Sequence, residues 1–446
     1  MSGSIEDMLR DAKVELVLAR VEKDPSIIKE LMRHLGNDLR SIRFNAALAL
    51  GELGEQAREA VSQLVTCLED EDWSICREAA RSLGKIGESA VDAIPSLSKL
   101  LVDEEPSVRK AAAISLGSIG VATDVALSSL VAALEDESEE IRTEVVKSLG
   151  IMGASAHEAI PVLIGRLKDT SWTVRNAAAQ AIRRIGTRSV EAIPTLVKTL
   201  EDDDWRVRHR SIETLAEIGD EAVPLLMESL NHPNQVVRKG AIETLGEMKI
   251  SDPTVISGIA SMLIDRSEAV RGKAADALRS IGKEAIPTLL DSFETANTKM
   301  KVIIVSAIGG MGADAQDAIP ALVGMMKEGR TSVRAEAASS LGKIGVGNKT
   351  VNQALVNALV DPKVDVRREA ALSLGKIGSA AADATPALIG ALSDKKPDVR
   401  WRASEALGRI GVANPKVTKA LDELLHDEFD FVAEAAQEAL DLIGGD

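Results

Sequence analysis

One phrase recurs along almost the whole chain at nearly constant spacing. Its form is Asp-x4-Val-Arg-x2-Ala-Ala-x2-Leu-Gly-x-Ile-Gly, and thirteen copies follow one another every 33 residues, apart from two steps of 30. A segment this short cannot bury a hydrophobic core alone, so the copies must stack on their neighbours. The Arg position of the phrase, used below as the reference position, is occupied in order by Arg43, Cys76, Arg109, Arg142, Arg175, Arg208, Arg238, Arg271, Lys301, Arg334, Arg367, Arg400 and Ala433.

Each copy contains two helical patterns. Apolar or small residues stand one before the reference position and three, seven and ten after it, which is one apolar stripe on an α-helix. A Gly eleven after the reference position ends that helix in twelve of thirteen copies. A second apolar pattern follows, as in residues 93–103, with a Pro in its first turn. The predicted fold class is therefore all-α, an α-solenoid, or superhelix, of about thirteen two-helix repeats.

The order of these elements resembles a known family. A Pro-bearing helix that ends in Leu-x-Asp, followed by a helix that begins Val-Arg-x2-Ala-Ala-x2-Leu-Gly, is similar to the HEAT repeat, and in particular to the prokaryotic HEAT-like repeats of the phycobilin lyase (PBS lyase) type. The resemblance implies that the Pro helix lies on the convex side and the Val-Arg helix on the concave side. It also implies a ladder of Asp and Arg through the turns.

The ladder can be assigned to positions of this sequence as a structural feature. Asp stands six residues before the reference position in most copies, where it can cap the free N–H groups of a helix start and accept from an Arg of its own or the next repeat. The predicted ladder residues are Asp103, Arg109, Asp136, Arg142, Asp169, Arg175, Asp202, Arg208, Asp265, Arg271, Asp361, Arg367, Asp394 and Arg400.

The repeats divide the chain without a linker. We expect one solenoid over residues 1–446, with an N-terminal capping helix in 1–24, twelve HEAT-like repeats in 25–414 and a C-terminal capping repeat in 415–446. The Asp slot holds His232 and Thr295 in the two copies reached by the shortened steps. Several Met residues cluster around the second of these, a soft choice for packing, and we hypothesise that residues 283–330 form the most deformable joint.

Composition restricts the function. The net charge of −16 disfavours nucleic acid as a partner, and the two Cys and five scattered His provide no metal site, so no cofactor and no metal are expected. No run of apolar residues is long enough for membrane insertion, and the N-terminus resembles no signal peptide, so a cytoplasmic protein is expected. The chain lacks the motifs of nucleophilic and phosphate-binding enzymes, and we expect no catalytic residues.

Candidate binding residues are those that break the repeat. Positions one and five after the reference position lie opposite the apolar stripe and change from copy to copy, whereas the buried positions hardly vary. Three Trp share the slot three before the reference position, where other copies have Pro, Glu, Gln or Thr. The candidates are Trp73, Trp172, Trp205, Trp401, Phe44, Arg77, Arg81, Lys110, Lys147, Glu213, Glu243 and Asp276. The alternatives are a solvated surface and Trp rings that lie on the neighbouring repeat's turn.

The sequence therefore predicts a non-enzymatic scaffold or adaptor that binds one or more protein partners on the concave face and the tryptophan edge. The alternative is a lyase-like or chaperone-like accessory subunit that handles a prosthetic group or its acceptor protein. That alternative follows from the resemblance in repeat type, since the repeat phrase itself contains no catalytic residue.

Overall fold

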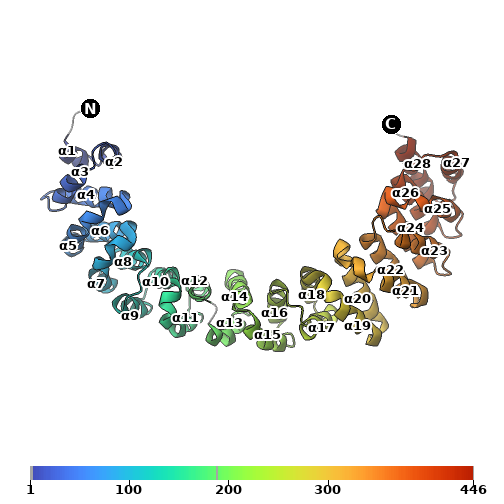
Figure 1. The fold of residues 1–446 in the computed structure, drawn as a ribbon, viewed down its shortest axis with the longest axis horizontal. Helices are drawn as coiled ribbons and strands as arrows, with labels where there is room; N and C mark the ends of the chain where they lie inside the picture. Colours follow the sequence, from blue (N-terminus) through green and yellow to red (C-terminus); the bar gives the residue numbers. More distant parts are fainter. Residues whose placement is uncertain (1–3, 187–188, 445–446) are drawn as a thin grey trace. The chain divides into compact units, whose positions relative to one another are not determined.

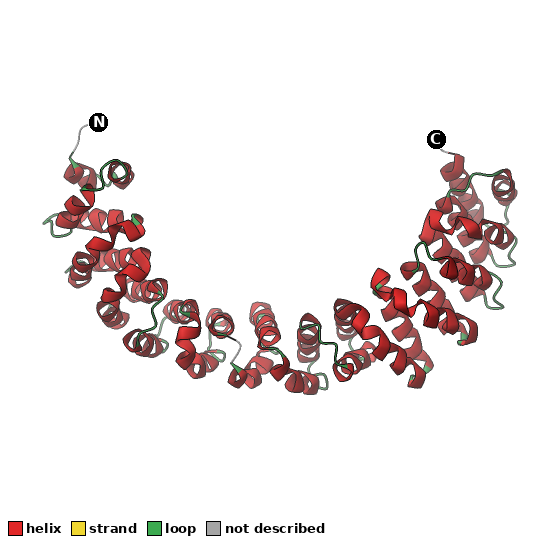
Figure 2. Ribbon diagram, in the orientation of Figure 1, coloured by secondary structure: helices red, strands yellow, loops and turns green. Residues whose placement is uncertain are grey.

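The computed structural model describes residues 4–186 and 189–444. The first three residues of the predicted N-terminal cap and the last two of the predicted C-terminal cap lie outside these ranges. All regular elements in the described ranges are α-helices or short 3₁₀ helices, as Figure 2 shows. The prediction of an all-α solenoid is confirmed.

The chain forms two compact units, Met1–Ser229 and Leu230–Asp446. In each unit, inner helices that contain the reference positions stack side by side, and outer helices cover them (Figure 1). The division lies between an outer helix and the inner helix whose Asp slot holds His232. No helix of the described residues is long and apolar enough to cross a membrane.

In the first unit two short helices precede the repeats, α1 (Ile5–Arg10) and α2 (Val14–Val21). The inner helices are α4 (Arg40–Glu52), α6 (Trp73–Ile86), α8 (Pro106–Ile119), α10 (Glu139–Ile151), α12 (Trp172–Ile185) and α14 (Trp205–Ile218). The outer helices are α3 (Ile27–His34), α5 (Val61–Thr66), α7 (Ile94–Lys99), α9 (Asp124–Ala133), α11 (Ile160–Arg166), α13 (Ile193–Thr199) and α15 (Val223–Ser229). The 3₁₀ helices are η1 (Gly54–Ala60), η2 (Cys67–Glu69), η3 (Gly87–Ala93), η4 (Leu100–Val102), η5 (Gly153–Ala159), η6 (Val190–Ala192) and η7 (Asp220–Ala222).

In the second unit the inner helices are α16 (Gln235–Glu247), α18 (Glu268–Ile281), α20 (Thr298–Gly310), α22 (Thr331–Ile344), α24 (Val364–Ile377), α26 (Pro397–Ile410) and α28 (Asp430–Gly444). The outer helices are α17 (Pro253–Ser261), α19 (Ile286–Thr295), α21 (Ile319–Glu328), α23 (Lys349–Ala358), α25 (Thr385–Ala391) and α27 (Pro415–Leu424). The 3₁₀ helices are η8 (Met262–Ile264), η9 (Gly282–Ala285), η10 (Gly312–Ala318) and η11 (Gly378–Ala384).

The apolar stripe of each inner helix is its buried face. In α8 the stripe consists of Val108, Ala112, Leu116 and Ile119, all of which are buried, and the helix ends at Gly120 in a left-handed conformation with φ of 73°. In one repeat Lys249 stands in place of this Gly, yet the φ of Lys249 is also positive, at 51°. The turn geometry of the repeat therefore persists where the residue does not favour it.

Successive inner helices meet along a line of small residues, which we call the glycine–serine seam. Gly84 of α6 lies against Ser115 of α8 so closely that a Cβ atom on it would stand 2.9 Å from the Ser115 Cα atom. The Ser115 hydroxyl donates to the carbonyl oxygen of Ala80 at 2.7 Å. The same contact is repeated by the pairs Gly51–Ser82, Gly117–Ser148, Gly309–Ser340 and Gly342–Ser373.

The N-terminal cap differs from the prediction of one capping helix in residues 1–24. The chain forms α1 and α2 instead, separated at Ala12, whose φ of 55° cannot continue a right-handed helix. Ser4 and Asp7 form a capping box at the start of α1, and this local signal stands in the sequence. The buried Ile5, Met8 and Leu9 cover the first repeat from α1.

Substitution of a seam glycine tests how closely the inner helices must approach. Gly84→Ala is expected to destabilise the first unit by about 1–3 kcal/mol, because the added methyl group meets the backbone of Ser115. Gly165→Ala in outer helix α11 is the matched control, since a Cβ atom there meets nothing within 4 Å. That change should stabilise by up to about 1 kcal/mol through helix propensity. Urea unfolding measures both, and equal midpoints would contradict the seam.

Candidate functional site

The predicted Arg and Asp residues form ion pairs between repeats. Arg109 donates from Nε to the Asp136 carboxylate at 2.7 Å, and from Nη1 to the carbonyl oxygens of Asp103 and Glu104 in its own repeat. Asp136 also accepts from the backbone N–H of Ser138, two residues later, at 2.8 Å. One guanidinium group thus joins two successive turns. Equivalent pairs are Arg43–Asp70, Arg142–Asp169, Arg175–Asp202, Arg238–Asp265, Arg334–Asp361, Arg367–Asp394 and Arg400–Asp427.

These contacts lower the pKa of several ladder aspartates. Hydrogen bonds from Arg238 and Arg400 hold the pKa values of Asp265 and Asp427 below the ordinary aspartate range. At Asp136 burial alone would raise the pKa, but the hydrogen bonds from Arg109 and the Ser138 N–H outweigh it and the pKa is lowered. A lowered carboxyl pKa contributes stability at neutral pH that is lost as the pH falls below about 4.

Three of the predicted ladder residues lack the inter-repeat ion pair in the described contacts. Asp103 accepts from the Glu105 N–H, but the reference position of the preceding repeat is Cys76. Arg208 and Arg271 use only Nη1, which donates to carbonyl oxygens of their own turns. For Arg271 the next slot holds Thr295, a side chain without charge.

A pair of substitutions in adjacent repeats separates the ion pair from the rest of the ladder. Arg238→Ala should destabilise the second unit by about 2–4 kcal/mol, because it leaves the largely buried Asp265 carboxylate without its guanidinium partner. Arg271→Ala removes only hydrogen bonds to carbonyl groups and should cost about 1 kcal/mol. Thermal unfolding monitored by circular dichroism measures the difference, and equal losses would show that the carboxylate contributes nothing.

Three of the predicted basic residues are brought together in the first unit. Arg77 and Arg81 of α6 and Lys110 of α8 line one open cavity of about 540 Å³ on the inner face. Lys85 adds a fourth cation, and Ile114 provides an exposed apolar surface. Lys110 pairs with Glu140, Lys85 pairs with Glu52 at 2.7 Å, and Arg81 lies 3.7 Å from the buried Glu78. Among the described ion pairs of this cluster, Arg77 has none. We call this site the basic cavity.

The tryptophan residues differ in exposure although three share one slot. Trp205 and Trp73 are 63% and 47% exposed, and the Arg77 guanidinium lies 5.1 Å from the Trp73 ring. Trp172 is covered by Arg206 of the next repeat at 3.5 Å. Trp401 packs edge-on against Phe431 of the C-terminal repeat and lies beneath Arg402. An open tryptophan edge is therefore provided by Trp73 and Trp205.

The other predicted site residues do not join one cluster. Glu213, Glu243 and Asp276 lie on α14, α16 and α18, and each pairs with a cation of its own unit, namely Arg210, Lys273 and Arg279. Lys147 pairs with Glu144 on α10, and the half-buried Phe44 lies on α4. The acidic positions are therefore largely compensated.

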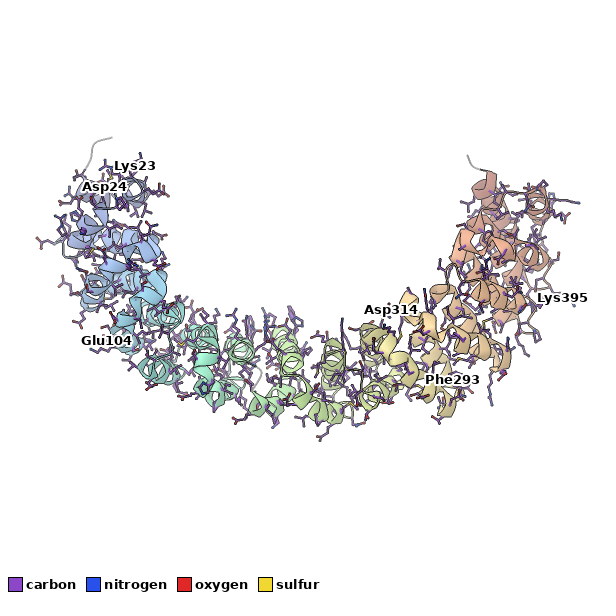
Figure 3. The ribbon with its side chains drawn as sticks, in the orientation of Figure 1. Lys23, Asp24, Glu104, Phe293, Asp314 and Lys395 are labelled. Carbon is purple, nitrogen blue, oxygen red and sulfur yellow. The ribbon has the colours of Figure 1, made fainter. Side chains whose placement is uncertain are left out.

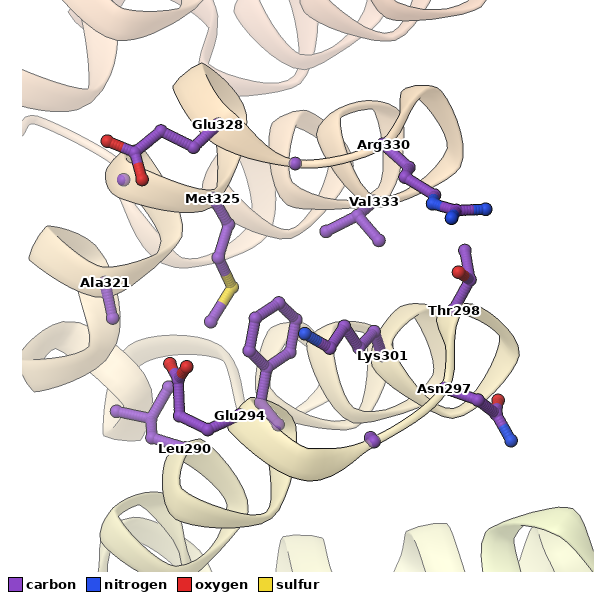
Figure 4. A pocket seen from close by; sticks show the side chains of 14 residues that line it. Leu290, Glu294, Asn297, Thr298, Lys301, Ala321, Met325, Glu328, Arg330 and Val333 are labelled. Carbon is purple, nitrogen blue, oxygen red and sulfur yellow. The ribbon is translucent and has the colours of Figure 1, made fainter.

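The second unit contains a further cavity, of about 720 Å³, which is lined in part by Lys301, the residue at the reference position of its repeat. Figure 4 shows Lys301 directed toward an aromatic ring, that of Phe293, with its Nζ atom 4.6 Å from the ring centre. Figure 3 places Phe293 on outer helix α19. Glu294 and Glu328 stand at the margin of this cavity, near Met325. Met and Phe side chains thus line the cavity at the repeat in which Lys replaces Arg at the reference position.

The thiols lie within the fold. Cys67 and Cys76 are free and buried, and burial raises the pKa of Cys67 to about 11. The Cys76 Sγ atom contacts the Asp70 carbonyl oxygen at 3.0 Å. The described part of the chain has no group of three or more His, Cys, Asp or Glu side chains placed to hold a metal ion.

Several functional residues were not found from the sequence. The seam serines lie six residues after the reference position, at a position that the repeat phrase leaves unspecified. The recurrence of Ser there, two residues before the Gly at eight, was the signal that could have identified the seam. Arg206 over Trp172 had no such signal, because the contact depends on the angle between two repeats. Lys85 and Ser107 of the basic cavity lie outside the two positions predicted to face the groove.

Comparison with known proteins shows the family. The HEAT repeats family matches residues 11–83, 61–135, 94–183, 160–245, 223–301 and 352–441. The chain therefore belongs to the HEAT-repeat family. Residues 302–351, which include most of α20 and α22, lie outside the matches. No curated protein sequence matches the chain.

Similar solved structures have low sequence identity. The structure of Kap121p bound to Pho4p has a TM-score of 0.51 at 15% identity, over 93% of this chain and 52% of the matched chain. A Kap95p structure with RanGDP has a TM-score of 0.41 at 17% identity, over 94% and 66%. An engineered protein has a TM-score of 0.26 at 23% identity, over 94% and 99%. This chain spans about half the length of the Kap121p-type chain, and that likeness shows the solenoid fold alone.

Proposed function

We propose that the chain is a non-enzymatic scaffold that binds a protein partner along the inner face and the tryptophan edge of its first unit. The observation that carries this proposal is the basic cavity, in which Arg77, Arg81 and Lys110 come together beside the exposed Ile114. Cations beside an apolar surface suit a segment that carries acidic and aliphatic side chains.

The exposed indoles supply the anchors that such a surface needs. Trp73 lies at the start of α6, the helix that contributes Arg77 and Arg81, and the Arg77 guanidinium lies 5.1 Å from its ring. This end of the tryptophan edge therefore adjoins the basic cavity. A half-exposed Trp loses little conformational entropy on binding and buries a large apolar area. The HEAT family and the Kap121p structure, which contains a bound protein, support a scaffold function.

Affinity capture with the full chain as bait tests the proposal. Trp73→Ala and the double substitution Arg77→Gln/Arg81→Gln should each reduce recovery of a captured protein at least tenfold, since an interfacial Trp or Arg commonly contributes about 2 kcal/mol. Trp205→Ala should weaken capture if the partner follows the edge as far as α14. Mass spectrometry identifies and quantifies the protein.

The controls use residues of the same type away from the surface. Arg58→Gln changes an exposed Arg of η1 outside the cavity and should leave recovery unchanged. Trp172→Ala removes a ring that Arg206 covers and should have a smaller effect than Trp73→Ala. Full recovery with both the Trp73 and the double Arg variants, with folding intact, would refute this surface. A chromophore or prosthetic group that copurifies with the chain would instead favour an accessory function.

A further inference from the structure

The ladder is interrupted at Arg271 in a way that leaves part of a guanidinium group without an acidic partner. In eight repeats an Arg donates from Nε and Nη2 to an Asp carboxylate of the next repeat, as Arg238 does to Asp265 at 2.8 Å. The hydrogen bonds described for Arg271 come from Nη1, to the carbonyl oxygens of Asp265 and Arg266 at 2.9 and 3.4 Å. The Nε–Nη2 edge is the one that binds a carboxylate elsewhere in the chain.

Arg271 also lines a cavity of about 710 Å³ between α18 and α20, which we call the α18–α20 cavity. The seam glycine of this repeat is replaced by Arg279, whose Nε atom donates to the Gly310 carbonyl oxygen at 3.1 Å. A long side chain thus stands where most other repeats have a Gly in close contact with the next inner helix. Gly272 and Ser306, which are small residues at the groove-facing positions, widen the opening.

The charges of the α18–α20 cavity favour an anion. Four cations line it, on Arg271, Arg279, Lys299 and Lys343, against two carboxylates, on Asp265 and Glu268. The Asp265 carboxylate already accepts hydrogen bonds from Arg238 and from the Ser267 N–H, each at 2.8 Å. Arg279 is held by Asp276 at 2.8 Å. Arg271, Lys299 and Lys343 remain as cations that face the cavity against the single carboxylate of Glu268.

We propose that the α18–α20 cavity binds an acidic peptide segment of a partner protein, with one carboxylate on the Nε–Nη2 edge of Arg271. The ligand then occupies the place that an Asp of the next repeat takes elsewhere in the ladder, with bidentate geometry. Lys299 and Lys343 attract the neighbouring negative charge. The inference rests on the proposed scaffold function, and it names the chemistry of a second contact, on the second unit.

The walls of the cavity favour a peptide over a small inorganic anion. Ile264 is 48% exposed at its margin, and Leu263, Ile303 and Ala307 line it with further apolar surface. A phosphate ion would leave this surface in contact with water, whereas an aliphatic side chain beside the carboxylate would cover it. The expected segment therefore carries Asp or Glu next to Leu, Ile or Val.

Isoleucine methyl NMR on the full chain tests the site directly. The probe is the blocked peptide acetyl-Gly-Leu-Asp-Asp-Leu-Gly-amide, titrated at low salt into protein labelled at the Ile δ1 methyl groups. The signals of Ile264 and Ile303 should shift with saturation, and Ile114 reports separately on the basic cavity of the first unit. Arg271→Gln should weaken the shifts at Ile264 and Ile303 at least tenfold and leave those at Ile114 unchanged.

Matched variants and ligands separate the sources of binding. Lys283→Gln changes an exposed Lys of η9 outside the cavity and should bind as the unmodified chain does. The peptide with both Asp replaced by Asn should not shift Ile264 or Ile303. Shifts that survive Arg271→Gln, or that inorganic phosphate at millimolar concentration reproduces at Ile303, would overturn the proposal. Because the probe is added directly, failure here leaves the capture experiment on Trp73 and Arg77 unaffected.

Discussion

The close approach of successive inner helices determines most of what this chain can be. At the seam a Cβ atom on Gly84 would come within 3 Å of the Ser115 backbone, so only Gly is accommodated on one side and only a small residue on the other. Helices at this separation leave room for Ala, Val, Ile and Leu between them and little room for aromatic rings. The near absence of aromatic residues, with no Tyr and four each of Trp and Phe, follows from that spacing.

The ladder adds a second constraint at the turns. Each complete pair connects a guanidinium group to carbonyl oxygens of one turn and to a carboxylate of the next, so it fixes the angle between two repeats as well as their distance. The α18–α20 cavity lies where both constraints are missing, because Arg279 replaces a seam glycine and Thr295 replaces a ladder aspartate. The cavity to which we assign an acidic peptide thus lies at two departures from the repeat.

The fold could be predicted because the same pattern, which specifies two helices and the turn between them, occurs thirteen times in the sequence. The apolar stripe, the terminal Gly and the Pro in the first turn are local signals, and all of them appear in the helices as expected. The candidate site was harder to predict from the sequence than the fold. The position five after the reference position identified Arg81. Whether Arg206 covers Trp172, or Lys85 lines a cavity, depends on contacts between repeats, which the sequence of one repeat does not determine. The break at Ala12 was missed because an Ala in the left-handed region has no sequence signature.

We expect the seam and the ladder together to set the rigidity of the stack. Hydrogen exchange of the native chain, followed by mass spectrometry, tests it most directly. We predict that amides of α19, α20 and α21 exchange faster than those of α8 and α10, which have the complete Arg109–Asp136 and Arg142–Asp169 pairs. Arg271 and Lys301 have no Asp partner in the described contacts, and two cavities of about 710 and 720 Å³ flank α20. Uniform protection across residues 283–330 and the complete repeats of α8 and α10 would contradict this expectation.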